Sequence, residues 1–268
     1  MCRLMAYMGR PILLDRLLLK PEHSLIVQSY EPREMTSGVV NADGFGIGWY
    51  HPENNTDPFT YKNLLPIWSD INLPQLSRYI ESGCVLGCVR SATPGQAVDL
   101  SNCPPFGDRR ILGIHNGFIE NFRQTLYRPL RNRLADDLYQ QIGGTTDSEH
   151  IFALFLSTLD VTADHHKQTH PPLTAALSST LATLTELAKP QGVKFSANLV
   201  VSDGHQLVAS RFANQSAAPS LYWLRDDPNF PDSVIIASEP LFDGDWNSLP
   251  EESLITVGEN LDININQI

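Results

Sequence analysis

The second residue of the chain, Cys2, combines two groups that could do chemistry together. If Met1 is removed, which the small side chain after it permits, a thiol and a free α-amino group stand on the same carbon. The ordinary pKa is about 8.5 for a cysteine thiol and about 7.7–8.0 for an α-amine. The amine can therefore accept the thiol proton near neutral pH, without a separate histidine base. The pattern predicts an N-terminal nucleophile, with a buried structural cysteine as the alternative.

A thiol that attacks an amide also needs hydrogen-bond donors for the oxyanion that develops. Residues 111–114 are apolar and predict a buried strand that ends at His115-Asn116-Gly117. Asn116 offers a side-chain amide, and Gly117 offers a backbone N–H that can come close to the reacting carbon because glycine has no side chain. An Asn-Gly pair that only forms a turn is the alternative.

Two charged residues could bind the ends of an α-amino acid. Residues 83–89 predict another buried strand, which Arg90 follows, with Ser91 and Thr93 close behind. A guanidinium can hold a carboxylate through two parallel hydrogen bonds, although a surface salt bridge is the alternative. Asp147 precedes a predicted helix, where it could be an N-cap or could bind an ammonium group. Arginine and aspartate together would suit glutamine or a γ-glutamyl group.

The composition excludes several classes of protein. The chain has 268 residues, 42% of them hydrophobic, and a net charge of −11. That charge argues against a nucleic-acid binder or a polybasic membrane-surface protein. No apolar run approaches the ~20 residues of a membrane span. The apolar stretch at residues 11–19 is broken by Asp15 and Arg16, so we expect neither a membrane anchor nor a secretory leader.

The four cysteines do not form a disulfide framework or a metal site. Cys84 and Cys88 share one predicted strand, where four residues span about 13 Å. A disulfide requires Cα atoms within about 7 Å, and the spacing also lacks the CxxC pairs of a zinc site. We therefore expect core cysteines and a reducing, cytoplasmic compartment. The eight histidines are scattered, and we expect neither a metal nor a cofactor.

Glycines alternate along residues 44–50, which predict a strand. Alternate glycines clear one face, so that another backbone or a ligand can approach closely. The pattern is GxGxG rather than GxGxxG, and no predicted helix follows, so we do not expect a dinucleotide-binding loop.

Predicted strands frame the chain and predicted helices occupy its middle. The other expected strands cover residues 2–7, 24–30, 59–63, 194–202, 205–212, 221–224, 233–237, 253–257 and 262–265. One expected helix begins at Pro11. The others cover residues 73–81, pieces of 121–142, 151–159 and 172–189. This α+β order predicts one domain, residues 2–268, with two stacked antiparallel sheets and helices outside them.

The order of these motifs resembles that of a known family. The chain resembles a class II glutamine amidotransferase domain of the N-terminal-nucleophile hydrolase fold, which is a four-layer αββα sandwich. The motifs that carry this resemblance are Cys2 and residues 41–46, 90–93, 115–117 and 146–149. More narrowly, the chain resembles the EgtC-type γ-glutamyl amidohydrolases of ergothioneine biosynthesis. The amidotransferase-like subunit of the fungal glutathione-degrading complex is similar over the same stretch. The segments that carry this narrower resemblance are residues 27–33, 41–46, 66–70, 89–93 with Gly95, and 104–106.

The resemblance implies roles for the reacting groups. Cys2 would be the nucleophile and its α-amine the base, and Asn116 and Gly117 would form the oxyanion hole. His115 precedes this pair and would lie beside the substrate.

The resemblance also implies how a γ-glutamyl substrate is held. Arg90, with Thr93 nearby, would bind its α-carboxylate, and Asp147 its α-ammonium. Ser91 stands where the glucosamine-synthase type has a tryptophan, so that wall of the pocket would differ.

The expected reaction follows from the same match. The chain ends at Ile268 with no room for a synthase domain, which favours hydrolysis of a γ-glutamyl amide as the whole reaction. The family points to γ-glutamyl hercynylcysteine sulfoxide, whose hydrolysis frees a cysteine amine for carbon–sulfur cleavage. The nearest alternative is a glutaminase or glutathione-degrading amidase subunit that works with a separate partner chain. A non-catalytic γ-glutamyl-binding module, in which Cys2 is structural, is the alternative from another class.

Overall fold

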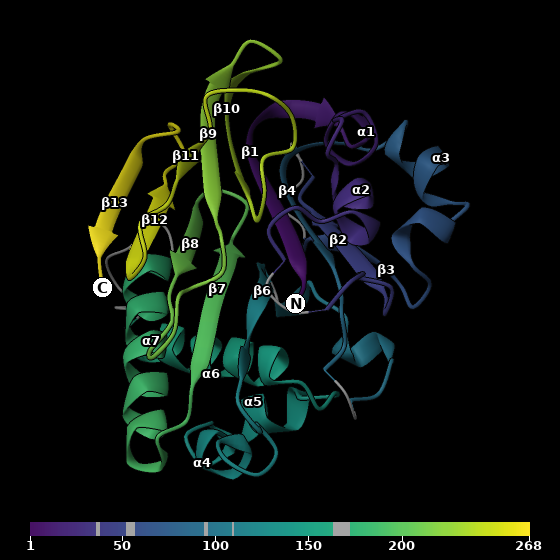
Figure 1. Ribbon diagram of the computed structural model, residues 1–268. Coiled ribbons are helices and arrows are strands. Elements are labelled where there is room, and N and C mark those ends of the chain that lie inside the picture. The colour runs from purple at the N-terminus through teal and green to yellow at the C-terminus, as the bar shows by residue number, and fades with distance from the viewer. Residues whose placement is uncertain (36–37, 52–56, 94–95, 109, 163–171) are drawn as a thin grey trace.

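The computed structural model describes residues 1–35, 38–51, 57–93, 96–108, 110–162 and 172–268 (Figure 1). Two antiparallel sheets form its centre. The first has the strand order β11-β9-β10-β1-β4-β2-β3. Its strands are β1 (Arg3–Leu13), β2 (Phe45–Trp49), β3 (Phe59–Asn63), β4 (Glu81–Val89), β9 (Tyr222–Asp227), β10 (Phe230–Ala237) and β11 (Asn247–Ser248).

The second sheet has the order β13-β12-β8-β7-β6-β5. Its strands are β5 (Phe106–Asp108), β6 (Ile111–Ile119), β7 (Phe195–Ser202), β8 (Leu207–Arg211), β12 (Ser253–Val257) and β13 (Ile263–Gln267). One apolar cluster joins the two inner faces, with members such as Leu4 and Leu86 from the first sheet and Ile114 and Val200 from the second.

Helices cover both outer faces, as Figure 1 shows. The first sheet packs against α1 (Asp15–Leu18), α2 (Leu25–Tyr30) and α3 (Leu73–Ser77). The second sheet packs against α4 (Tyr127–Arg131), α5 (Asp136–Gln141), α6 (Asp147–Thr162) and α7 (Leu173–Ala188). Short 3-10 turns lie at η1 (Ile67–Ser69), η2 (Leu100–Asn102) and η3 (Lys189–Gln191). The predicted αββα sandwich is confirmed. Among the described residues, no helix has both the length and the apolar character that a bilayer crossing requires.

Two of the expected elements are wrong. The sequence predicts a strand at residues 24–30, but Leu25–Tyr30 form α2, whose buried Leu25, Gln28 and Ser29 follow helical spacing. Packing on the sheet therefore overrides the strand propensity. The helix expected from Pro11 is also wrong, because β1 continues to Leu13. Its register against β4 shifts between Met8 and Ile12, and such a bulge tolerates a residue that lacks an N–H.

The alternate glycines of β2 allow a close backbone approach, as expected. A Cβ atom at Gly46 would lie 2.1 Å from the Pro104 carbonyl oxygen. The neighbouring segment, which leads into β5, therefore packs directly on the backbone of β2. The space that the missing side chain leaves is filled by protein rather than by a ligand.

We predict that Gly46→Ala destabilises the protein by about 1–3 kcal/mol, because a carbonyl on a second chain segment must move. Gly87→Ala is a matched control on the adjacent strand β4. Its added Cβ would meet only side-chain ends, Leu25 Cδ2 at 3.3 Å and Met5 Sδ at 3.4 Å. Urea denaturation at constant m-value measures both costs. Equal costs for the two variants would contradict the backbone contact.

Candidate active site

Cys2 lies immediately before β1, where this strand meets the end of β4. The register pairs Arg3 with Val89 and Leu4 with Cys88. Continuing that register places Cys2 beside Arg90. The Cys2 side chain packs against the apolar cluster between the two sheets. The pairing of these two strands therefore brings the thiol to the first residues that follow β4.

The groups around Cys2 lower the pKa of its thiol to about 6. The hydrogen bond with the Cys88 thiol is the largest cause of the lower pKa. Burial opposes it, whereas the Ser91 backbone N–H and the positive charges of the Met1 ammonium and of Arg90 favour the thiolate. With this pKa, most of Cys2 is ionised at pH 7.

The other three cysteines are kept protonated. Burial raises the pKa of Cys84 to about 12 and raises that of Cys103. The pKa of Cys88 is raised well above its usual value because this thiol donates to Cys2 and is buried. All four cysteines are free, so the expectation of core cysteines without a disulfide is confirmed for Cys84 and Cys88. Among the described residues, no group of histidine, cysteine or carboxylate side chains could hold a metal ion.

Arg90 is 3% exposed, which contradicts the alternative of a surface salt bridge. Its Nη1 donates to the Asp43 carbonyl oxygen at 3.4 Å, and its Nη2 to the Ala97 carbonyl oxygen at 3.2 Å and to Gln96 Oε1 at 3.5 Å. Each of these partners is a neutral oxygen. These three hydrogen bonds therefore fix the guanidinium in place, and none of them uses a carboxylate.

Ser91 and Thr93 follow Arg90 in different surroundings. The Ser91 backbone N–H is the one that interacts with the Cys2 thiol. Thr93 is exposed, and its carbonyl oxygen accepts from the Gln96 backbone N–H at 3.0 Å. The segment that is predicted to bind substrate, residues 90–93, therefore contacts the Cys2 thiol through Ser91.

The expected end of a strand at His115-Asn116-Gly117 is wrong, because β6 continues to Ile119. All three residues pair with β7. This pairing holds the backbone extended, whereas an isolated Asn-Gly pair would form a turn. The strand places Asn116 on the inner face of the sheet. Its Nδ2 lies 3.4 Å from Ser238 Oγ, and this hydroxyl also accepts from the Leu4 backbone N–H at 3.0 Å. The Asn116 amide therefore lies near the start of β1, where Leu4 is two residues from Cys2.

The N–H of Gly117 points to the edge of β6 that faces away from β7. In a strand, successive N–H groups point to opposite edges. Glu120 N–H donates to Lys194, on the β7 side, while Ile119 N–H donates to Asp147 Oδ2 at 2.8 Å. Gly117 precedes Ile119 by two residues and shares its direction. Glycine is required here, since a Cβ atom would lie 2.0 Å from the Ser196 carbonyl oxygen.

Asp147 begins α6, but the hydroxyl that caps this helix belongs to Thr146, which accepts from Glu149 N–H at 3.2 Å. The Asp147 carboxylate instead accepts from Ile119 N–H and, through Oδ1, from Ser148 N–H at 2.9 Å. A carboxylate has about four acceptor positions, so further donors can bind. Asp147 is thereby held beside the same edge of β6 as the Gly117 N–H.

His115 lies on the opposite face of β6 from Asn116, because side chains alternate along a strand. Its Nδ1 lies 2.8 Å from Ser148 Oγ and its Nε2 3.3 Å from the Ser196 carbonyl oxygen. Burial lowers its pKa, although Asp147 and the Ser196 carbonyl oppose this effect. The ring therefore packs against the start of α6 through Ser148. A contact between His115 and substrate stays a prediction.

Sequence reasoning missed three polar residues at this site, namely Arg3, Ser238 and Glu239. Ser238 and Glu239 directly follow the buried strand β10, and Arg3 is the first residue of the largely apolar strand β1. Polar residues at the end of a buried strand were the signal that singled out Arg90. The same signal would have found Ser238 and Glu239.

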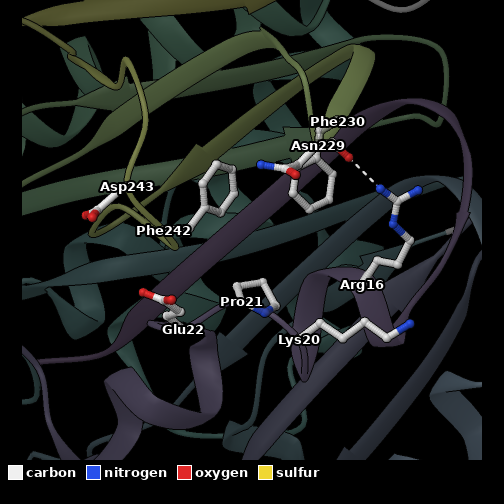
Figure 2. Close-up of a pocket in the computed structure, with 8 residues that line it drawn as sticks. All are labelled: Arg16, Lys20, Pro21, Glu22, Asn229, Phe230, Phe242 and Asp243. Carbon is white, nitrogen blue, oxygen red and sulfur yellow. Dashed lines mark hydrogen bonds between the residues drawn. The ribbon is translucent and has the colours of Figure 1, made fainter.

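Figure 2 shows a pocket of about 390 Å³ near α1, beyond the far end of β1 from Cys2. The Phe230 and Phe242 rings stack there with centroids 5.4 Å apart. None of the predicted site residues lines it. Its lining residues are Arg16, Lys20, Pro21, Glu22, Asn229, Phe230, Phe242 and Asp243.

We predict that iodoacetamide alkylates Cys2 selectively, with a rate that rises through pH 6 and levels off above pH 7, because the thiolate reacts. Cys88→Ala removes the largest cause of the low pKa and should move this midpoint upward by about one pH unit. Cys84→Ala, on the same face of β4, is the control and should leave it unchanged. Peptide mass spectrometry measures the rates. An unshifted midpoint in Cys88→Ala would refute the thiol pair.

Comparisons with known proteins agree with this geometry. The family described as class II glutamine amidotransferases matches residues 19–230. The chain is 32% identical to a probable glutamine amidotransferase, DUG3, of Saccharomyces cerevisiae, over 96% of this chain and 82% of the yeast protein. It is 31% identical to the gamma-glutamyl-hercynylcysteine sulfoxide hydrolase of Mycolicibacterium smegmatis, over 96% of each protein.

A solved structure gives the same result. A glutamine aminotransferase class-II domain protein from Silicibacter pomeroyi superimposes with a TM-score of 0.70 at 26% identity, over 100% of this chain and 99% of that one. The predictions of the family, of its N-terminal-nucleophile fold and of an enzyme are thereby confirmed. The chain belongs to the class II glutamine amidotransferases.

Proposed function

We propose that this protein hydrolyses a γ-glutamyl amide with Cys2 as an N-terminal nucleophile after removal of Met1. The observation that carries the proposal is the Cys2 thiol, whose pKa is lowered to about 6 beside Cys88, Ser91 and Arg90. A buried structural cysteine has the opposite property, as Cys84 illustrates with a pKa raised to about 12.

The reaction has two halves. The Cys2 thiolate attacks the γ-carbonyl carbon, and the negative charge moves to the carbonyl oxygen, where Asn116 Nδ2 and the Gly117 N–H donate to it. The C–N bond then breaks, and the amine product leaves with a proton from the Cys2 α-ammonium. Water, deprotonated by that α-amine, attacks the resulting thioester and releases glutamate and the thiol.

The γ-glutamyl group is held at its α-carbon. The buried guanidinium of Arg90 binds the α-carboxylate, and Ser91 and Thr93 contribute hydroxyls beside it. Asp147, which accepts from Ile119 N–H, has acceptor positions left for the α-ammonium. Binding both charges fixes the γ-carbonyl relative to the thiol.

The favoured substrate is γ-glutamyl hercynylcysteine sulfoxide, by similarity to the Mycolicibacterium smegmatis hydrolase along 96% of both chains. A second candidate, a glutaminase or glutathione-degrading subunit that works with a partner chain, is favoured by the similarity to the yeast amidotransferase. We place the enzyme in the cytoplasm, which the four free thiols support.

A panel of γ-glutamyl amides tests the reaction. We predict that the purified protein lacks Met1 by intact mass and releases glutamate from γ-glutamyl hercynylcysteine sulfoxide faster than from glutamine or glutathione. Cys2→Ala should abolish turnover but retain substrate binding, and Cys84→Ala should retain both. Activity only in the presence of a copurified partner would favour the second candidate. Retained Met1 with binding but no turnover would favour a binding module.

We predict that Asn116→Ala lowers kcat by about 10²–10³-fold with little change in KM, because this donor acts mainly on the transition state. Steady-state kinetics on the preferred γ-glutamyl amide measures the effect. Cys2 should still be alkylated at the wild-type rate, which shows that the site remains folded. A rise in KM at constant kcat would assign Asn116 to substrate binding instead.

A further inference from the structure

A buried ion pair lies directly behind Cys2. The Arg3 side chain is 0% exposed, and its Nε donates to the Cys2 carbonyl oxygen at 2.8 Å. Its Nη1 donates to Glu239 Oε1, also at 2.8 Å, and the Glu239 side chain is 1% exposed. Burying such a pair costs desolvation energy, and apolar replacements are often at least as stable. Stability alone therefore gives no reason for an arginine at this position.

Glu239 is held firmly in its charged form. Its Oε2 lies 2.7 Å from His23 Nε2 and accepts from the Arg33 backbone N–H at 2.8 Å, while its Oε1 also accepts from the Glu34 N–H at 3.0 Å. Although burial acts to raise it, these bonds and the charge of Arg3 lower the pKa of Glu239 to about 2. The carboxylate therefore anchors Arg3 at all physiological pH values.

The geometry also places the guanidinium close to the α-amine of Cys2. Within one residue, the backbone nitrogen and carbonyl oxygen are at most about 3.6 Å apart. With the 2.8 Å bond from Arg3 Nε to the Cys2 carbonyl, the amine nitrogen lies within about 6.5 Å of Nε. A permanent positive charge at this distance, in a buried site, disfavours a second positive charge.

Other charged and titratable groups lie around Cys2. β4 contributes the Cys88 thiol, the segment after it contributes Arg90, and the segment before β5 contributes Cys103, all of which interact with the Cys2 thiol. The protonated thiols are neutral, and the charge of Arg90 has the same sign as that of Arg3. The Glu239 carboxylate, 2.8 Å from Arg3 Nη1, is the negative charge that opposes the effect of Arg3 on the amine. The Cys2 thiolate also opposes it. The N-terminal amine, which here is on Met1, already has a lowered pKa, mainly because of burial and partly because of Arg3.

We propose that Arg3, anchored by Glu239, is a positioning residue that fixes the Cys2 backbone and keeps the Cys2 α-amine neutral, so that it can accept the thiol proton. The proposal rests on the proposed function, in which this amine is the base. The Arg3 side chain would thus have two roles. The hydrogen bond to the carbonyl orients the nucleophile, and the charge sets the protonation of its base.

Two substitutions separate these duties in the full-length protein, with the N-terminus of each variant verified by intact mass. Arg3→Gln removes the charge and leaves Glu239 with its other three donors. Arg3→Lys keeps the charge, but its single ammonium cannot reproduce the two-sided geometry of the guanidinium. The first measurement is the pH dependence of Cys2 alkylation by iodoacetamide. The second is the pH dependence of kcat/KM on γ-glutamyl-p-nitroanilide.

We predict that Arg3→Gln moves the alkylation midpoint and the acid limb of kcat/KM upward by about one pH unit, because removing a nearby cation raises the pKa of both the amine and the thiol. Arg3→Lys should keep both midpoints but lower kcat several-fold at unchanged KM. Arg211→Gln is the matched control, since Arg211 also donates to carbonyl oxygens, of Pro219 at 3.0 Å and Leu249 at 2.6 Å. It should lower the thermal midpoint without moving the pH profiles.

Wild-type midpoints in Arg3→Gln, or an equal shift in Arg211→Gln, would overturn the proposal. If Arg3→Gln does not fold, Arg3→Lys decides, because wild-type kcat in that variant would overturn the positioning duty. Alkylation requires no turnover. A wild-type protein that hydrolyses no γ-glutamyl amide would therefore refute the proposed function, while the alkylation shift would still report on Arg3.

Discussion

The antiparallel pairing of β1 with β4 is the interaction on which the site depends. It joins Arg3 to Val89 and Leu4 to Cys88, and thereby brings the start of the chain to the end of a buried strand. The thiol donor, the backbone N–H of Ser91 and the charge of Arg90 all come from β4 or the residues that follow it. A shift of one residue in this register would turn Cys2 to the other face of the sheet.

The second sheet contributes through one hydroxyl. Ser238 Oγ lies between Asn116 on β6 and the Leu4 backbone on β1, so it links the two sheets two residues along the chain from Cys2. The spacing of the sheets is set elsewhere by apolar side chains and by the close approach at Gly46. The relative position of Cys2 and Asn116, the proposed nucleophile and oxyanion donor, is therefore a property of the whole sandwich rather than of a loop.

Much of this could be predicted from the sequence, because most of the information is local. Strands with buried apolar runs, such as β4 and β10, were recognised along with the polar residues that end β4. Residues 24–30 were not, because a helix of one and a half turns with Ile26 and Val27 has the composition of a strand. The course of β6 through Asn116 and Gly117 was missed for a different reason. An Asn-Gly pair prefers a turn, and only the partner strand β7, almost eighty residues later, holds it extended. The Arg3–Glu239 pair joins residues 236 positions apart, which no local pattern reveals.

The place of β1 between β4 and β10 has a consequence for the timing of synthesis. β10 pairs with β1 through residues 233–237, so the central strand cannot be enclosed until the chain has been made as far as residue 237 of 268. At about 5–20 residues per second, this delay is roughly 10–50 s. Until then the first residues of the nascent chain remain accessible to enzymes that remove an initiating methionine. Removal of Met1, on which the proposed function depends, can thus precede the enclosure of β1.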